Sequence, residues 1–234
     1  MSLVAQAKEP HPGKVTVFPA SITPVVIMGA GGWTFSIAFF VVQAIVQAAS
    51  ARPFSLTTNL ISDLGNTACG PAVCSPLHDL MNGTFIAVGL LHWGGAAATW
   101  RAWPAGMRSR IGLVLLALAG WGLAYAGIFP ENVAPEMHRF GALLGLISLN
   151  VSMLLLGSVL LETARAVGVL ALLAGIVGLV ALVLFISQVP GLPTGIWERL
   201  ADFPSAAMVV FVGAFILIRV VKVRRRDSAS LLRN

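Results

Sequence analysis

Six long apolar stretches divide this chain, and they restrict its fold more than any other feature. They cover about residues 23–49, 80–100, 111–129, 140–161, 167–189 and 204–221. A helix needs roughly 20 apolar residues to cross the hydrocarbon core of a bilayer. The chain has 57% hydrophobic and 10% charged residues, whereas soluble domains carry about 25% charged residues. We therefore predict an all-α polytopic membrane protein, a bundle of six transmembrane helices.

The apolar stretches also define the predicted domains. Residues 1–21 form a cytoplasmic N-terminal tail, residues 22–222 the transmembrane domain, and residues 223–234 a basic cytoplasmic tail. The first stretch is too long and starts too late for a cleaved signal peptide, whose apolar core spans about 7–15 residues, so we predict a retained span. Residues 194–203 carry apolar side chains at helical spacing, which predicts a separate short amphipathic helix at the interface before a last span that starts at Pro204.

Basic residues are unevenly divided between the two ends of the predicted bundle. One end holds Lys8, Lys14, Arg101, Arg108, Arg110, Arg165 and the cluster from Arg219 to Arg226, and the other holds Arg52, Arg139 and Arg199. Positive charge is retained in the cytoplasm, so we predict a plasma-membrane protein with both termini cytoplasmic. The charges follow span ends, which fits membrane lipids as partners. They form no basic face with aromatic residues, which argues against nucleic-acid binding.

The densest polar segment, NLISDLGNTACGPAVCSPLHDLMN, covers residues 59–82 and lies in the first predicted outside loop. It contains both cysteines of the chain, Cys69 and Cys74. A disulfide is the expected state in an oxidising compartment, with free thiols and a metal half-site as alternatives. Ser75 and Pro76 are typical of a helix start, with serine at the cap and proline in the first turn.

The outside segments bring ionisable and amide side chains together at one end of the bundle. Two histidines and several carboxylates in one place can support general acid–base chemistry. The candidate catalytic residues are His78, Asp79, Glu131, His138 and Glu198. The candidate ligand-binding residues are Asn59, Asp63, Asn82, Asn132, Arg139 and Trp197.

Two other interpretations of these residues stay open. A divalent metal could bind His78, His138 and one carboxylate, but no local metal-binding motif is present, and we predict no cofactor. Alternatively, ion pairs of Arg139 or Arg199 with Asp63, Asp79 or Glu198 close the end of the bundle, and the cluster is purely structural.

Two polar residues lie within the predicted spans. Asn150 is near the middle of the fourth span, and its amide needs a partner on another helix or in a cavity. His92, in the second span, is interpreted as a packed, hydrogen-bonded histidine. The predicted spans have no central carboxylate, which argues against a proton-coupled transporter.

The elements NLISDLG, SPLHDLMN, PEN with a following histidine, and GLPTGIWERL resemble a bacterial and archaeal membrane family, the family of unknown function numbered 998. The resemblance runs from the first span to the sixth and implies a six-helix fold with an outward polar site. The polar positions that match are Asn59, Ser62, Asp63, His78, Asn82, Glu131, His138, Trp197 and Glu198. The cysteines are an addition to this pattern. The ISDLG element is also similar to the ISDTG-type stretch of eukaryotic DRAM and Sfk-type six-span proteins.

Three functions are compatible with these features. The first is an enzyme that acts on a lipid or an isoprenoid-type amphiphile by acid–base chemistry, with a histidine or carboxylate as base. The second is a non-catalytic module for lipid binding, assembly or sensing. The third is a small transporter, which the absence of an internal repeat disfavours.

Overall fold

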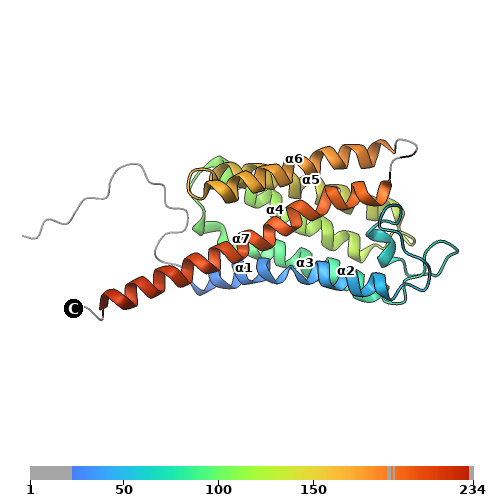
Figure 1. The fold of residues 1–234 in the computed structure, drawn as a ribbon, viewed down its shortest axis with the longest axis horizontal. Helices are drawn as coiled ribbons and strands as arrows, with labels where there is room; N and C mark the ends of the chain where they lie inside the picture. Colours follow the sequence, from blue (N-terminus) through green and yellow to red (C-terminus); the bar gives the residue numbers. More distant parts are fainter. Residues whose placement is uncertain (1–22, 189–190, 192, 232–234) are drawn as a thin grey trace, which may run out of the picture.

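The computed structural model describes residues 23–188, 191 and 193–231, with 223–231 as backbone alone. The described part is all-helical, which confirms the predicted class, and its long helices run along one axis (Figure 1). The long helices are α1 Pro24–Phe35, α2 Ala38–Ala48, α3 His78–Thr99, α4 Met107–Ile128, α5 Pro135–Leu160, α6 Arg165–Ser187 and α7 Thr194–Leu231, and the short ones are η1 Ser62–Gly65 and η2 Trp100–Ala102. The predicted N-terminal tail, residues 1–21, lies outside the described residues.

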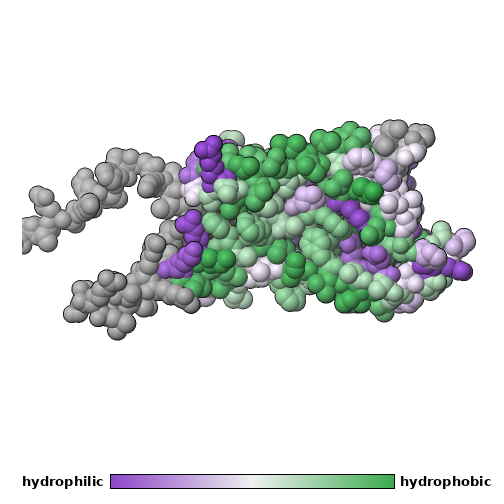
Figure 2. Space-filling model, in the orientation of Figure 1, coloured by the Kyte–Doolittle hydropathy of each residue, from purple (hydrophilic) through white to green (hydrophobic). Residues whose placement is uncertain are grey.

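Five segments are long and apolar enough to cross a membrane. They are Pro24–Ala48, Met107–Ile128, Pro135–Leu160, Arg165–Ser187 and Thr194–Lys222. The remaining predicted span is α3, which has 22 residues like α4 but carries polar residues such as His78, Asp79 and His92. Large apolar side chains are exposed along the bundle, and hydrophilic residues gather toward its two ends (Figure 2). These features are those of an integral membrane protein.

The first span is not one straight helix. α1 ends at Phe35 and α2 begins at Ala38, so the chain is interrupted at Ser36 and Ile37. The Ser36 hydroxyl donates to the Gly32 carbonyl at 3.2 Å, a bond back to the preceding turn that often bends helices. The interruption places the buried Ser36 against the interior of the bundle.

Residues 194–203 are helical, as predicted, but they are part of α7, so the prediction of a separate short helix is wrong. α7 runs from Thr194 to Leu231 with Pro204 inside it. Proline removes one helix hydrogen bond, but membrane helices tolerate it where other groups bond the freed backbone. Beside the proline, the Asn150 amide of α5 donates to the Ala201 carbonyl at 2.8 Å.

Asn150 joins three helices, which confirms that its amide has a partner on another helix. Its Oδ1 accepts a 2.7 Å hydrogen bond from the Ser205 hydroxyl of α7. On α6, a Cβ added to Gly178 would lie 1.8 Å from the same oxygen. The close approach therefore requires glycine there. Small residues at helix contacts permit such packing in membrane bundles.

Candidate functional site

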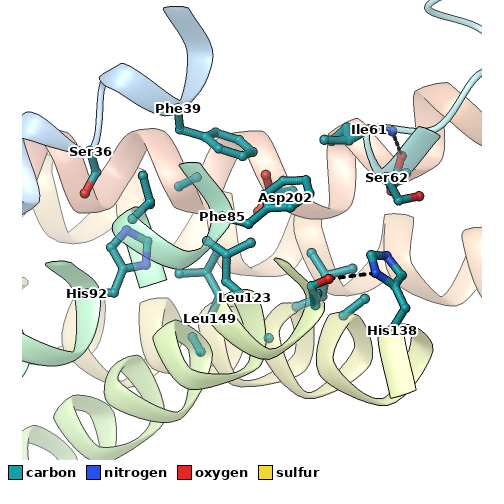
Figure 3. Close-up of a pocket in the computed structure, with 18 residues that line it drawn as sticks. Ser36, Phe39, Ile61, Ser62, Phe85, His92, Leu123, His138, Leu149 and Asp202 are labelled. Carbon is teal, nitrogen blue, oxygen red and sulfur yellow. Dashed lines mark hydrogen bonds between the residues drawn. The ribbon is translucent and has the colours of Figure 1, made fainter. Parts of the chain in front are cut away.

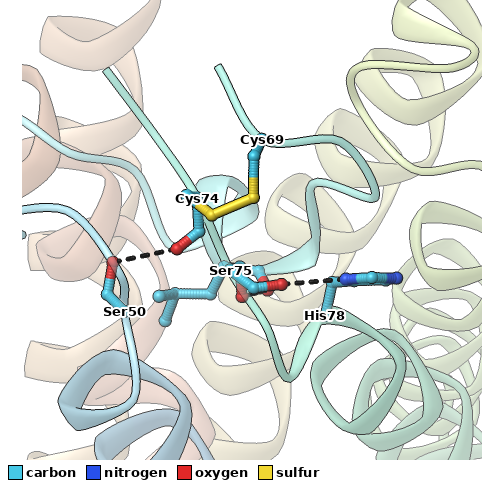
Figure 4. The surroundings of a disulfide bond; sticks show 6 residues. Ser50, Cys69, Cys74, Ser75 and His78 are labelled. Carbon is cyan, nitrogen blue, oxygen red and sulfur yellow. Dashed lines mark hydrogen bonds between the residues drawn. A yellow bond between two sulfur atoms is a disulfide. The ribbon is translucent and has the colours of Figure 1, made fainter. Parts of the chain in front are cut away.

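The loop between α2 and α3 is closed by the predicted disulfide. Cys69 and Cys74 are bonded, with Cα atoms 4.2 Å apart (Figure 4). The Cys74 carbonyl accepts hydrogen bonds from the Ser50 hydroxyl at 3.3 Å and from the Ala51 N–H at 3.0 Å. These bonds join the disulfide segment to the end of α2.

Several predicted ligand-binding residues make hydrogen bonds within this loop or between it and α3. Asp63 accepts hydrogen bonds from the Leu60 N–H at 2.8 Å and from the Asn59 side chain at 3.1 Å. The buried Asn82 of α3 donates to the Gly65 carbonyl at 2.8 Å. These hydrogen bonds hold the loop together and join it to α3, while the ligand-binding role of these residues stays a prediction.

The predicted helix start at Ser75 is shifted. α3 begins at His78, and the Ser75 hydroxyl donates to the Leu64 carbonyl at 2.7 Å rather than capping the helix. The His78 ring nitrogen Nδ1 is 2.8 Å from the Ser75 carbonyl oxygen (Figure 4). The Asp79 side chain is 96% exposed, and its Oδ1 lies 3.4 Å from His78 Nε2.

The segment before α5 is exposed. The Asn132 side chain makes two hydrogen bonds with Thr67. Its Oδ1 accepts from the Thr67 N–H at 3.1 Å, and its Nδ2 donates to the Thr67 hydroxyl at 3.2 Å. Arg139 pairs with Glu136 at 3.3 Å, and both side chains are largely exposed. Glu131 is partly buried, and its Oε2 has no hydrogen-bond partner in the described part of the chain.

The start of α7 is bonded to the loop through two adjacent residues. Glu198 Oε2 accepts a hydrogen bond from the Ile61 N–H. Arg199 is buried, and its Nη1 donates to the carbonyls of Asn59 at 2.7 Å and Leu56 at 3.2 Å. Backbone groups of the loop thus bond side chains of α7, although Nε and Nη2 of Arg199 have no hydrogen-bond partner among the described residues.

The predicted closing network of ion pairs is wrong. Within the described ranges, the ion pairs are His78–Asp79, Arg108–Glu162 and Arg139–Glu136. Neither Arg139 nor Arg199 pairs with Asp63, Asp79 or Glu198. At Arg199, backbone carbonyls of the loop bind Nη1 in place of a carboxylate.

Beneath the loop, a cavity of about 80 Å³ lies between the helices (Figure 3). Its walls come from the α1–α2 interruption, η1, α3, α4, α5 and α7. One water needs about 10–15 Å³ of such space, so the cavity has room for several waters or a small ligand group. On α5 its lining extends from His138 to Leu149, about 16 Å along the helix at 1.5 Å per residue.

Most of the cavity wall is apolar, but ionisable groups project into it from three helices. They are His92 of α3, His138 of α5, and Glu198 and Asp202 of α7. Figure 3 shows His92 near Ser36 at one end, His138 nearer Ser62 at the other, and Asp202 between them. Within the described residues, no group of three or more His, Cys, Asp or Glu side chains is arranged to hold a metal ion.

The hydrogen bonds of His138 define its tautomer. Nδ1 lies 3.0 Å from the carbonyl oxygens of both Ala126 and Phe129. Carbonyls only accept, so Nδ1 carries the proton and neutral His138 has its lone pair on Nε2. In this tautomer Nε2 is the ring nitrogen that can accept a hydrogen bond or a proton.

A family model described as "Protein of unknown function (DUF998)" matches residues 34–215. This chain belongs to the DUF998 family. The resemblance expected from the sequence is thereby confirmed, while the similarity to eukaryotic six-span proteins stays a prediction. Comparisons with curated proteins and with solved structures gave no match. The DUF998 match includes every residue that lines the cavity.

The cavity of this DUF998 protein contains only part of the predicted site. Glu198 and His138 line it, whereas His78, Asp79, Glu131 and Arg139 are not among the lining residues. Trp197 packs against the cluster formed by Ala181, Leu182 and Ala201.

Two ionisable residues of the cavity were not among the predicted site residues. His92 is buried, at 3% exposed, as expected of a packed histidine. Its Nε2 has no hydrogen-bond partner among the described residues, so the expected hydrogen bond is absent at that nitrogen. Asp202 was placed outside the last span because of Pro204. It lies four residues after Glu198, a spacing that puts both on one helix face, and this was the signal available in the sequence.

Proposed function

We propose that this protein is a membrane enzyme that performs acid–base chemistry on a lipid or isoprenoid-type amphiphile. The observation that carries the proposal is the cavity, where carboxyl and imidazole groups project from apolar walls between membrane helices. Ionisable residues within membrane segments are costly and are usually functional. A pocket that is largely apolar with a few converging polar groups is also the usual form of a small-molecule site.

Asp202 is the proposed proton donor. Its side chain lines the cavity and makes no hydrogen bond or ion pair with another described residue. A proton on this carboxyl group is therefore directed to whatever occupies the cavity. Glu198 lies one helical turn away, but its Oε2 is bonded to the Ile61 N–H, which makes it the better fixed of the two carboxyl groups.

His138 is the proposed base. Its Nδ1–H is held by two carbonyls, and its Nε2 lone pair is left to take a proton from the substrate. Asp202 and His138 come from different helices, so a substrate between them would gain a proton on one side and lose one on the other. Such a reaction requires no redox partner.

The dimensions of the cavity limit the part of the substrate that reacts inside it. A volume of about 80 Å³ holds a small group, not a whole lipid, so the remaining chain would extend between the helices. The rings of Phe39 and Phe85 line the cavity, with centroids 6.1 Å apart. Aromatic faces stabilise positive charge, which favours a substrate that becomes cationic when protonated, such as an alkene of an isoprenoid chain.

Non-catalytic lipid binding is the second candidate function. It is favoured by the internal hydrogen bonds of Asp63 and Asn82, which show that much of the polar motif holds the loop and is not exposed to a ligand. In that case the same cavity would bind an amphiphile without changing it.

The test incubates purified protein with a total lipid extract of the expressing cells and follows the lipids by mass spectrometry. We expect the wild type and His78→Ala to convert one lipid species. In Asp202→Asn and in His138→Gln, the rate of this conversion should be at least tenfold lower. A lipid that co-purifies unchanged, and is lost in Asp202→Asn, would support binding and contradict catalysis. No conversion and no co-purified lipid would overturn both proposals.

A further inference from the structure

A second hollow lies on the side of the bundle, between α3 and α4. It has a volume of about 540 Å³ and is lined by tryptophan, alanine and aliphatic side chains, within the range of about 300–1,000 Å³ usual for ligand pockets. Two of the tryptophans, Trp93 and Trp121, are 56% and 49% exposed. This groove is separate from the cavity, with which it shares no lining residue.

The groove runs along the helices. It is lined by Trp93 and Ala97 of α3 and by Trp100, the first residue of η2, which are spaced four and three residues apart and so share one face. On α4 it extends from Leu113 to Trp121. Trp93 lies seven residues before Trp100, and Trp121 lies seven residues before Ile128, the last residue of α4. Seven residues of helix measure about 10 Å, so both tryptophans lie well inside the ends of the bundle. A belt of interfacial tryptophans does not explain residues at that depth.

One end of the groove is positively charged. The Arg110 guanidinium lies 4.7 Å from the centre of the Trp100 ring and donates to the Trp100 carbonyl. Arg101, the next residue in the chain, is exposed and makes no hydrogen bond or ion pair with another residue that the structure describes. By contrast, Arg108 is already paired with Glu162 at 2.6 Å.

We infer that this groove binds an anionic phospholipid of the surrounding bilayer. An acyl chain fills the apolar length between the tryptophans, and the phosphate lies at the end where Arg101 and Arg110 are. Charge complementarity selects an anionic over a zwitterionic lipid, because both arginines are permanently cationic. The same end of the bundle is the one predicted to be cytoplasmic, where bilayers present anionic lipids.

The test uses tryptophan fluorescence in vesicles of phosphatidylcholine that contain an equal fraction of either brominated phosphatidylglycerol or brominated phosphatidylcholine. Bromine quenches nearby tryptophans. We expect the brominated anionic lipid to quench at least twofold more strongly, and Trp93→Phe with Trp121→Phe, which leaves Trp100 in the groove, to reduce this difference. Equal quenching by the two lipids in the wild type would overturn the inference.

Arginine variants separate headgroup recognition from general contact with lipid. Arg101→Gln, which removes no described contact, should lower the preference for the anionic lipid, and Arg101→Gln with Arg110→Gln should abolish it. Arg52 is an exposed arginine at the opposite end of the bundle. Arg52→Gln is therefore the matched control and should keep the preference for the anionic lipid. An unchanged preference in the double variant would contradict the proposal. Because the groove is separate from the cavity, Asp202→Asn should also keep the preference.

Discussion

At the scale of single residues, the contact of Gly65 with Asn82 determines how the loop rests on α3. A Cβ added to Gly65 would lie 2.3 Å from Asn82 Oδ1. Gly65→Ala therefore forces the amide out of its place, and we expect a loss of about 1–3 kcal/mol in the free energy of unfolding. Gly83→Ala is the control, because nothing lies within 4 Å of its added Cβ. Thermal unfolding in detergent compares the two variants, and equal midpoints would contradict the prediction.

The sequence predicted where the polar residues lie better than it predicted what these residues do. The ISDLG element was recognised as important, and the structure explains it: Ile61 and Leu64 are buried, Asp63 bonds the loop, and Gly65 contacts Asn82. His92 could not be assigned in the same way. An isolated histidine in an apolar span has no neighbour in the sequence that indicates an unpartnered nitrogen in a cavity.

At the scale of helices, Asn150 is the main polar connection between α5 and α7. It donates to the Ala201 carbonyl and accepts from the Ser205 hydroxyl. Asn150→Ala leaves both buried groups without this partner, and we expect it to cost about 1–3 kcal/mol. Ser158→Ala on the same helix is the control, because Ser158 donates to the Leu155 carbonyl of its own helix. Chemical unfolding in detergent tests this, and a loss no larger than that of the control would refute it.

The disulfide affects a short segment. Cys69 and Cys74 are five residues apart, and closing so small a loop is worth about 2 kcal/mol in the chain-entropy model. Cys69→Ser with Cys74→Ser should therefore lower stability by no more than that, because the Ser50 and Ala51 hydrogen bonds also hold Cys74. Reductant should lower the midpoint of the wild type and leave the double variant unchanged. Complete unfolding of the bundle on reduction would be inconsistent with this expectation.

The apolar stretches predicted where the helices lie, but they did not predict where a helix is interrupted or continues past a proline. The predicted spans at 111–129, 140–161 and 167–189 agree with α4, α5 and α6 to within a few residues. Pro204 was taken as a helix start because proline is common in the first turn. In the structure it lies inside α7, where contacts with α5 outweigh its local preference. That error placed Asp202 before the last span, whereas it lies within the candidate span Thr194–Lys222.

At the scale of the whole molecule, the two ends of the bundle differ in composition. Hydrogen bonds between Asn132 and Thr67, and between Thr194 and Thr58, join the three connecting segments of one end. At the other end, Arg108 pairs with Glu162 across two connections. The sequence predicted this division because it follows from the number of spans. The cavity could not be predicted, since its residues come from helices that are distant in the chain.

The end of the bundle that carries the α2–α3 loop is called the loop end here, and His138, Ser62 and Glu198 of the cavity lie toward it. The orientation of the loop end in the membrane decides which leaflet would supply a ligand to the cavity. The excess of arginine at the other end predicts that the loop end faces away from the cytoplasm. In a chain with Cys69→Ser and Cys74→Ser, Val133→Cys should react with a membrane-impermeant maleimide on intact cells, because Val133 is 64% exposed. Ala105→Cys, in an exposed position of the opposite connection, should react after permeabilisation alone. The reverse pattern would place the loop end in the cytoplasm, and a substrate would then enter the cavity from the inner leaflet.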